Sequence, residues 1–278
     1  MSDVRVELGP VQETLLIPLL GRAEQTRRRG GLLHDPKAVE IVERLDYDFT
    51  KWKGIRSLMG ASIRAHMFDE EVTTFLDANP DGTVVEIGAG LNTRFERLDN
   101  GRAQWLEIDL PDSMGLRRQF FEDVPRRRML AASVLDTDWL EEVAELPGPY
   151  CFVAEAVLIY LDNADAERAL RQIGERFPGS WLVTDTTSTF QVENQHKHDA
   201  MKKMGQQSWF RWKCDDPASL SAWGLDLERS RSFLDAPREV FARIPLLYRV
   251  VFGWLPFLVR KQVGGYRITR FRFQSQPA

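Results

Sequence analysis

The stretch Val84-Val85-Glu86-Ile87-Gly88-Ala89-Gly90 decides the fold class of this chain. It begins with a short, mainly apolar run, which predicts a buried strand that ends at Gly88. The glycines that follow allow a tight turn and let the backbone come close to a ligand. Pro80-Asp81-Gly82 predicts another turn just before the strand. A strand that runs directly into a glycine turn is typical of ligand-binding α/β folds.

The sequence after this strand alternates between apolar runs and helical segments. Further buried strands are predicted at 104–108, 128–135, 150–154 and 180–184. The clearest helix spans 162–177, with Asp162 or Asn163 as its N-cap. Late strands are predicted at 224–229 and 265–273, and the second alternates apolar and basic residues, as an antiparallel or edge strand should. We therefore predict an α/β fold, a doubly wound, Rossmann-like sheet of seven strands.

Residues 1–80 show helical rather than strand patterns and predict an N-terminal helical cap. Asp35 is a plausible N-cap, because Pro36 follows it at the first helical position. Two further helices are predicted at about 54–66 and about 69–78, the second with Asp69 as its N-cap.

Residues 81–278 would then form the sheet domain. Within it, a segment of about 187–222 is too long for a simple crossover and is rich in aromatic side chains. We expect a lid or substrate wall inserted after the fifth strand, with an extra packed helix pair as the alternative. Met201, Trp209 and Trp212 are the residues expected to bind a substrate there.

The composition argues against several classes of protein. The chain has 278 residues, a net charge of −4 and a pI of about 5.7, which give no basic footprint for nucleic acid. Cys151 and Cys214 cannot form a disulfide framework, so we expect a reducing, cytoplasmic location. The longest apolar stretch, 244–259, contains Arg249 and Pro256 and is too short to span a bilayer. A buried helix and loop are expected there, with an interfacial membrane helix as the alternative.

A carboxylate follows the second predicted strand at a spacing that suits an adenosine cofactor. Asp109 lies 21 residues after Gly88, and a carboxylate at about this spacing commonly holds the ribose hydroxyls. A dinucleotide fingerprint would need a third glycine where this chain has Thr93, so a pyrophosphate would have a weaker cradle. S-adenosyl-L-methionine has no phosphate and needs only the first turn. The residues favour a methyltransferase over a nicotinamide-dependent oxidoreductase, which remains an alternative.

Ordered motifs along the chain resemble the leucine carboxyl methyltransferase family, including its bacterial branch of tetracenomycin-type polyketide O-methyltransferases. The longest is Val85-Glu86-Ile87-Gly88-Ala89-Gly90-Leu91-Asn92-Thr93-Arg94-Phe95-Glu96-Arg97-Leu98. The others are Ser62-Ile63-Arg64-Ala65, Glu107-Ile108-Asp109-Leu110-Pro111 and Val153-Ala154-Glu155-Ala156-Val157-Leu158-Ile159-Tyr160-Leu161. The resemblance covers about residues 35–240 and implies a class I methyltransferase.

The resemblance also implies a role for each matching position. Arg64 would hold the methionyl carboxylate of the cofactor, Glu155 would face its ammonium group, and Tyr160 would shape the pocket behind Glu155. Asp109 would hold the ribose diol, and 133–135 would flank the adenine. The full set expected around the cofactor is Arg64, Glu86, Gly88, Ala89, Gly90, Asp109, Leu110, Ser133, Val134, Leu135, Glu155 and Tyr160.

The chain departs from the family pattern in places. Asn92 replaces the usual aspartate, which removes a charge near the cofactor. Ser133-Val134 stands where the family often has Asp-Leu, so Asp136 is an alternative partner for the adenine. Other assignments also have alternatives: Lys53 or Arg56 could replace Arg64, and Glu86 and Glu155 could simply cap helices.

The activity implied by the resemblance is in-line methyl transfer to a carboxylate or hydroxyl of a small aromatic or polyketide-like metabolite. A carboxylate acceptor needs no general base, whereas a hydroxyl acceptor is helped by one. His196 and His198 in the lid are the candidate bases, and without a third ligand they predict no metal site. A protein that binds S-adenosyl-L-methionine without transferring the methyl group is an alternative. We expect a small-molecule partner, no nucleic acid and no stable membrane insertion; the oligomeric state stays open.

Overall fold

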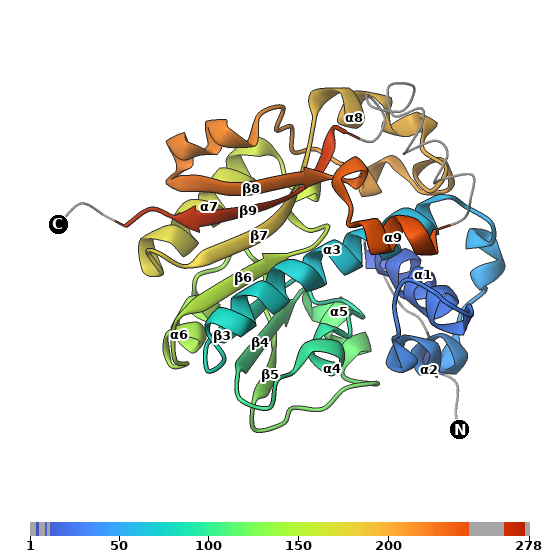
Figure 1. Ribbon diagram of the computed structural model, residues 1–278, viewed down its shortest axis with the longest axis horizontal. Coiled ribbons are helices and arrows are strands. Elements are labelled where there is room, and N and C mark those ends of the chain that lie inside the picture. The colour runs from blue at the N-terminus through green and yellow to red at the C-terminus, as the bar shows by residue number, and fades with distance from the viewer. Residues whose placement is uncertain (1–3, 6–8, 10–11, 245–263, 276–278) are drawn as a thin grey trace.

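The computed structural model describes residues 4–5, 9, 12–244 and 264–275. Within them the main sheet has seven strands in the order β5-β4-β3-β6-β7-β9-β8 (Figure 1). These strands are β3 (Thr83–Ile87), β4 (Gln104–Asp109), β5 (Arg127–Ala131), β6 (Tyr150–Ala154), β7 (Trp181–Thr187), β8 (Leu225–Ser232) and β9 (Tyr266–Phe273). Near the N-terminus, β1 (Val4–Arg5) pairs with β2 (Leu45–Asp46). The predicted fold class and seven-stranded sheet are confirmed.

The pairing of the strands indicates where a ligand would bind on the sheet. Neighbouring strands from β5 to β7 run parallel, and β9 pairs antiparallel with both β7 and β8. Strands β4 and β5 lie on one side of β3, and strands β6 and β7 lie on the other, so the strand order reverses at β3. Ligands of open α/β sheets bind at the carboxyl ends of the strands beside such a reversal. The basic and apolar alternation of β9 belongs to an interior antiparallel strand, since β8 forms the edge.

Helices cover both faces of the sheet, which is why every residue of β3 is buried. The α-helices are α1 (Leu16–Arg27), α2 (Pro36–Arg44), α3 (Ser57–Ala78), α4 (Arg94–Leu98), α5 (Pro111–Arg117), α6 (Asp138–Ala144), α7 (Asn163–Arg176), α8 (Thr189–Asn194) and α9 (Arg238–Arg243). Helix α3 crosses the face turned toward the viewer in Figure 1. Right-handed crossovers place α4 and α5 on one face of the sheet and α6 and α7 on the other.

Helix starts were partly predictable. Asp35 caps α2 through the backbone N–H of Ala38 at 3.0 Å, and Asp162 caps α7, as predicted. The prediction of separate helices at 54–66 and 69–78 was wrong, because α3 runs through both without a break. Asp69 is no N-cap; it lies inside α3, nearly buried, where guanidinium groups satisfy its carboxylate.

The N-terminal part of the chain, the predicted cap, packs against both the residues after α5 and the segment at 187–222. Leu16 of α1 and Ile41 of α2 share an apolar cluster with Phe120, which follows α5. Trp52, between α2 and α3, shares another cluster with Ala200. The cap is therefore held close to the carboxyl ends of the strands, where α1 and α2 are seen in Figure 1.

The segment at 187–222 is built from short turns. After α8 it continues as 3₁₀ turns at 195–197, 201–203, 206–208 and 217–223. The alternative of a packed helix pair is wrong, because only the short α8 and these separate 3₁₀ turns are formed in the segment. Asp199 ties the segment to the start of α3, since its carboxylate accepts hydrogen bonds from the backbone N–H of Arg56 at 2.5 Å and from the hydroxyl of Ser57.

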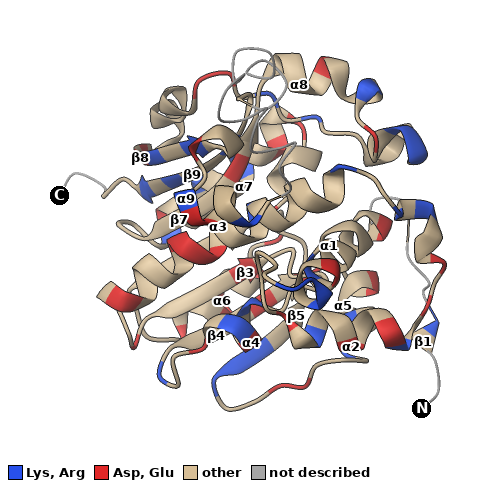
Figure 2. Cartoon of the chain, turned by 45° about the vertical axis from the view of Figure 1, so that its right-hand side comes forward, with Lys and Arg blue, Asp and Glu red and all other residues tan. Residues whose placement is uncertain are grey.

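None of the described helices is both long and apolar enough to cross a membrane. Nearly all of the predicted helix and loop at 244–259 lies outside the described residues, so that prediction is untested. Figure 2 shows acidic and basic residues interspersed over the elements in view, in keeping with the small net charge of −4.

Candidate functional site

The glycine loop after β3 forms the floor of the site. Gly88 and Gly90 adopt φ angles of +67° and +47°, which side chains rarely tolerate. A Cβ atom on Gly88 would overlap Cγ2 of Val157, in the loop after β6. A Cβ atom on Gly90 would lie 3.4 Å from Cβ of Leu15, just before α1. The loop is thus enclosed by the β6 loop and by the cap; Val157 leaves no room for a side chain at Gly88, whereas at Gly90 the positive φ is what favours glycine.

Asp109 closes the loop from the end of β4. Its Oδ2 accepts a hydrogen bond from the N–H of Gly90 at 2.6 Å, and its Oδ1 accepts one from the N–H of Leu110 at 2.7 Å. Burial raises the pKa of Asp109 although these amides act in the opposite direction. Each carboxylate oxygen keeps capacity for a further donor, and the Leu110 side chain is 40% exposed beside it. The arrangement suits a sugar diol next to an apolar surface.

The loop after β5 completes this side of the site. The predicted strand at 128–135 ends at Ala131, so 133–135 lie in the loop. Ser133 donates its backbone N–H to Asp136 at 3.0 Å, and its hydroxyl accepts the N–H of Leu135 at 3.2 Å. Val134 is buried. Leu135 and Asp136 also line a groove of about 390 Å³ along β5 and α6.

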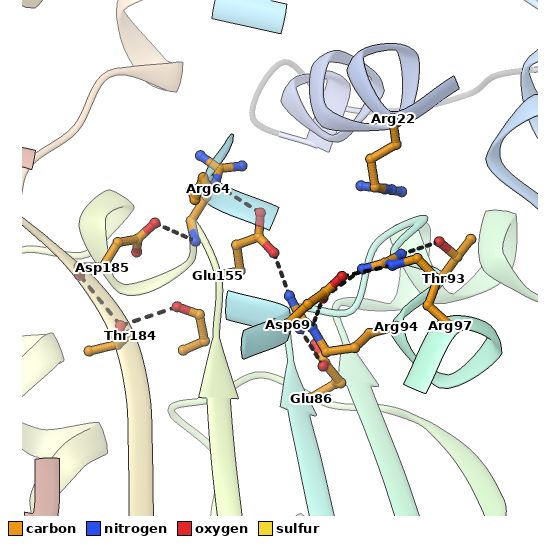
Figure 3. Close-up of polar contacts among 12 residues, drawn as sticks. Arg22, Arg64, Asp69, Glu86, Thr93, Arg94, Arg97, Glu155, Thr184 and Asp185 are labelled. Atoms are coloured by element: carbon orange, nitrogen blue, oxygen red, sulfur yellow. Dashed lines mark hydrogen bonds and ion pairs between the residues drawn. The ribbon is translucent and has the colours of Figure 1, made fainter. Parts of the chain in front are cut away.

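A buried guanidinium joins the elements around the loop. Arg94 of α4 is almost fully buried and pairs with three carboxylates (Figure 3). Its Nε lies 2.9 Å from Asp69, its Nη2 lies 2.6 Å from Glu155, and its Nη1 binds Glu86. Glu86 and Glu155 therefore bind Arg94, and the alternative that they cap helices is wrong.

A second set of buried pairs connects this network to the cap. Arg97 binds Asp69 at 2.8 Å, and Arg22 of α1 binds Asp35 at 2.9 Å. Arg22 also donates from Nη2 to the backbone oxygen of Leu91 at 2.7 Å. The cap is thus fastened to the glycine loop by charged hydrogen bonds, which are stronger than neutral ones.

Arg64 of α3 lies on the β6 and β7 side of the site. Its Nε donates to Glu155 Oε1 at 2.8 Å, and its Nη1 donates to the hydroxyl of Tyr266 at 3.2 Å. Burial acts to raise the pKa of Glu155, but Arg64 and Arg94 outweigh it and hold that pKa below its ordinary value. Glu155 is therefore ionised at neutral pH.

The Arg64 cluster continues to the end of β7. The hydroxyl of Tyr266 donates to Asp185 Oδ2, which also accepts the N–H of Ala156 at 2.9 Å. Burial raises the pKa of Asp185 to about 6. Of the alternatives to Arg64, Lys53 and Arg56 occupy exposed positions before α3.

None of the described contacts joins the site residues predicted in the lid to the clusters around Arg94 and Arg64. His196 and His198 are exposed, and the nearest charged partner of His198 is Asp199 at 3.7 Å. Met201 and Trp212 are buried, and Trp212 stacks on Trp223 with ring centres 6.0 Å apart. Trp209 is half-buried. Tyr160 is closer to the site, since its ring lies 5.4 Å from that of Phe210, which in turn lies 6.5 Å from that of Tyr266.

Sequence reasoning missed much of the buried network. The residues missed are Arg22, Asp69, Arg94, Arg97, Asp185 and Tyr266. Asp185 was within reach, because it directly follows the fifth strand predicted from the sequence, and the carboxyl ends of strands are where ligands bind. The partners of Arg22 and Arg97 depend on tertiary packing and left no local signal.

The strand order with its antiparallel β9, the glycine loop and the match to known sequences together define a methyltransferase that uses S-adenosyl-L-methionine. The chain belongs to the leucine carboxyl methyltransferase family, whose model matches residues 16–174.

Named relatives agree with this assignment. The chain is 31% identical over 242 residues to the tetracenomycin polyketide synthesis O-methyltransferase TcmP of Streptomyces glaucescens, covering 86% of this chain and 88% of that one. It is 28% identical over 282 residues to the S-adenosyl-L-methionine-dependent methyltransferase dpfgK of Gibberella zeae, covering 92% and 91% of the two chains.

Solved structures share the fold. A DUF574 family protein from Streptomyces avermitilis superposes with a TM-score of 0.59 at 14% identity, covering 94% of this chain and 97% of that one. The magnesium protoporphyrin IX methyltransferase of Synechocystis, solved with bound S-adenosylhomocysteine, gives a TM-score of 0.50 at 14% identity, covering 82% and 94%.

Proposed function

We propose that this protein transfers a methyl group from S-adenosyl-L-methionine to an oxygen atom of a small aromatic or polyketide-like molecule. The observation that carries the proposal is the pairing of Arg64 with Glu155 beside the glycine loop. A guanidinium and a carboxylate at one point are complementary to the carboxylate and ammonium groups of a methionyl tail.

The proposed cofactor contacts follow the carboxyl ends of the strands. Arg64 would bind the methionyl carboxylate and Glu155 the ammonium group, with Tyr160 behind them. Gly88, Ala89 and Gly90 would let the backbone approach the cofactor, and Glu86 would hold the loop indirectly through Arg94. Asp109 would accept hydrogen bonds from the ribose hydroxyls. Leu110 and the loop at 133–135 would flank the adenine.

The groups around the third fingerprint position argue against a cofactor that contains a pyrophosphate. Thr93, in the position of the third fingerprint glycine, is fully buried and donates to Asp35 at 2.5 Å. Arg22 and Arg97 are likewise committed to carboxylates within the protein. These groups are therefore engaged and are poorly placed to hold a pyrophosphate.

Methyl transfer requires the protein mainly to align the acceptor oxygen with the methyl group of the cofactor. The bound cofactor supplies a methyl group already activated by a positively charged sulfur. The chain would position the acceptor oxygen and exclude water, and such positioning is worth about 7–11 kcal/mol in well-oriented reactions. The lid residues Met201, Trp209 and Trp212 are proposed as acceptor-side residues, and His196 and His198 as proton acceptors if the segment closes.

The oxygen acceptor is supported by the relative TcmP, whose name describes an O-methyltransferase. The aromatic content of the lid supports a flat, apolar acceptor. The free, buried Cys151 and Cys214 suit the proposed cytoplasmic location.

Calorimetric titration tests the cofactor. The protein should bind S-adenosylhomocysteine and should not bind NAD under the same conditions. Incubation with methyl-labelled S-adenosyl-L-methionine and a panel of phenols and aromatic acids should then give labelled methyl ethers or esters. Tight NAD binding, or cofactor binding without transfer to any acceptor, would favour the alternatives.

A further inference from the structure

Arg117 is a buried cation that the proposed cofactor contacts do not use. It lies on α5, and its side chain is fully buried. Its Nε donates to Glu107 Oε2 at 2.9 Å, and its Nη2 lies 2.7 Å from the same oxygen. Its guanidinium carbon lies 4.1 Å from the centre of the Phe121 ring. Because a charge removed from water needs such partners, the position of this guanidinium is fixed from several sides.

The same guanidinium holds the glycine loop by its carbonyl groups. Nη1 of Arg117 donates to the backbone oxygen of Gly90 at 3.0 Å and to that of Asn92 at 2.7 Å. These two carbonyls lie on either side of Leu91, which is buried. The backbone polar groups of a loop need partners that regular secondary structure does not supply. Arg117 therefore provides two of the hydrogen bonds that fix the shape of this loop.

The loop in turn holds Asp109. The N–H of Gly90 donates to Asp109 Oδ2 at 2.6 Å, whereas the carbonyl oxygen of Gly90 accepts from Arg117. Glu107 and Asp109 are two residues apart on β4, so their side chains leave the strand on the same face. The contact between Arg117 and Gly90 therefore links two carboxylates of one strand. A shift of the guanidinium would move the Gly90 backbone and, with it, the amide that orients Asp109.

The charge of Arg117 acts on Asp109 as well. Burial raises the pKa of Asp109, whereas the groups around the carboxylate act to lower that pKa: the amides of Gly90 and Leu110, the charge of Arg117 and the hydroxyl of Ser113. An ionised carboxylate is a stronger acceptor for hydroxyl groups than a protonated one. Arg117 therefore favours the form of Asp109 that a contact with a sugar needs.

We propose that Arg117 is a positioning residue for the cofactor: it holds the carbonyl groups of Gly90 and Asn92 and thereby places Asp109 to recognise the two ribose hydroxyls. The inference rests on the proposed function, in which Asp109 binds the ribose. It gives α5 a part in selecting the cofactor, through a buried side chain that acts by way of the glycine loop.

Adenosine and 2′,3′-dideoxyadenosine provide matched probes, since they share the adenine and differ only in the ribose hydroxyls. Ligand-observed NMR, with displacement by S-adenosylhomocysteine, measures their affinities for the protein. The unaltered protein should bind adenosine at least about tenfold more tightly, because the analogue lacks the groups that donate to Asp109. In Arg117→Met this preference should fall at least about threefold, because the carboxylate is no longer held in place.

A merely structural role of Arg117 predicts a different result. A general loss of structure would weaken both probes by the same factor and leave the preference for adenosine unchanged. Arg117→Met also leaves Glu107 without its cation, which can prevent folding. The double variant Glu107→Gln with Arg117→Met removes the buried pair together, and the preference should fall in this variant as well.

Arg231→Met is the control variant. Arg231 of β8 is likewise buried and binds Glu70 at 3.0 Å and Glu71 at 2.8 Å. None of the described contacts joins it to the glycine loop. This variant should lower the free energy of unfolding without changing the preference for adenosine.

Combining Arg117→Met with Asp109→Ala tests the route by which Arg117 acts. Each single variant should weaken the binding of S-adenosylhomocysteine. Because both changes affect the same contact, the combined loss of affinity should be smaller than the product of the two separate losses. Calorimetry measures the three affinities beside that of the unaltered protein.

The outcomes separate the two proposals. The role of Arg117 would be overturned by an unchanged preference in the Arg117 variants, by an equal fall in Arg231→Met, or by independent losses when Arg117→Met is combined with Asp109→Ala. Binding of S-adenosylhomocysteine to the unaltered protein is measured first, and its failure would instead overturn the proposed function.

Discussion

At the residue scale, Gly88 occupies a position where two constraints coincide. Its φ of +67° disfavours any side chain, and Val157 fills the space where a Cβ atom would lie. The glycine loop can therefore keep its shape only while residue 88 has no side chain.

Gly88→Ala should lower the free energy of unfolding by about 1–3 kcal/mol and weaken S-adenosylhomocysteine binding at least about tenfold. Gly101→Ala is a matched control, because Gly101 has a φ of +79° but nothing within 4 Å of its Cβ position. Denaturant unfolding measures the stability of the two variants, and calorimetry measures their affinity for S-adenosylhomocysteine. Equal loss of affinity in both variants would contradict a special role for Gly88.

Asp109 makes a separate prediction about the ribose. Asp109→Ala should weaken binding of S-adenosylhomocysteine by about 1–3 kcal/mol, since hydrogen-bonding groups of the ligand lose their partner. The control is Asp81→Ala, which removes an exposed carboxylate paired with Arg102 and should leave this affinity unchanged. Unchanged affinity in Asp109→Ala, measured by calorimetry, would remove Asp109 from the site.

Asp185 predicts a pH dependence of stability with a definite sign. Burial raises its pKa from 3.8 to about 6, so between these values the folded state binds a proton more readily than the unfolded state. The cost of burying the charge therefore begins near pH 4, grows between pH 4 and pH 6 and is nearly complete by pH 7. The stability of Asp185→Asn relative to the unaltered protein should therefore improve by about 2 kcal/mol from pH 4 to pH 8. Urea unfolding measures the stability of both proteins. A stability difference between them that does not vary with pH would contradict the raised pKa of Asp185.

At the element scale, strands were predictable because burial on both faces makes them apolar runs. The run at 150–154 coincides with β6, and the run at 84–87 lacks only the first residue of β3. Helix α3 was wrongly divided at Asp69, because a charged residue within an apolar pattern resembles an N-cap when its partners are unknown. Those partners, Arg94 and Arg97, come from another part of the chain.

The junction of α3, α4, β3 and β6 depends on Arg94. Arg94→Met should lower the free energy of unfolding by about 3–5 kcal/mol, because it leaves Asp69, Glu86 and Glu155 without their shared cation. Arg102→Met breaks an exposed pair with Asp81 and should leave the free energy of unfolding nearly unchanged. Denaturant unfolding measures both, and equal costs would show that the buried network adds little.

At the scale of the whole molecule, the cap, the sheet and the segment at 187–222 meet at the carboxyl ends of the strands. Arg22 fastens the cap to the glycine loop, and Asp199 fastens the segment to the start of α3. The proposed cofactor contacts could be named from the sequence, because their residues follow strands within recognisable motifs. The group around Asp185 could not, since Asp185, Phe233 and Tyr266 come together only through the pairing of β7 with β9 and the packing around it.

The central claim is that the loops after β3 and β4 hold a sulfonium nucleoside. Crystals of the protein soaked with S-adenosylhomocysteine test it most directly. We expect density for the ribose against Asp109 and for the amino-acid tail between Arg64 and Glu155. Clear density for the ligand elsewhere with this niche empty, or NAD bound here in a parallel soak, would contradict it.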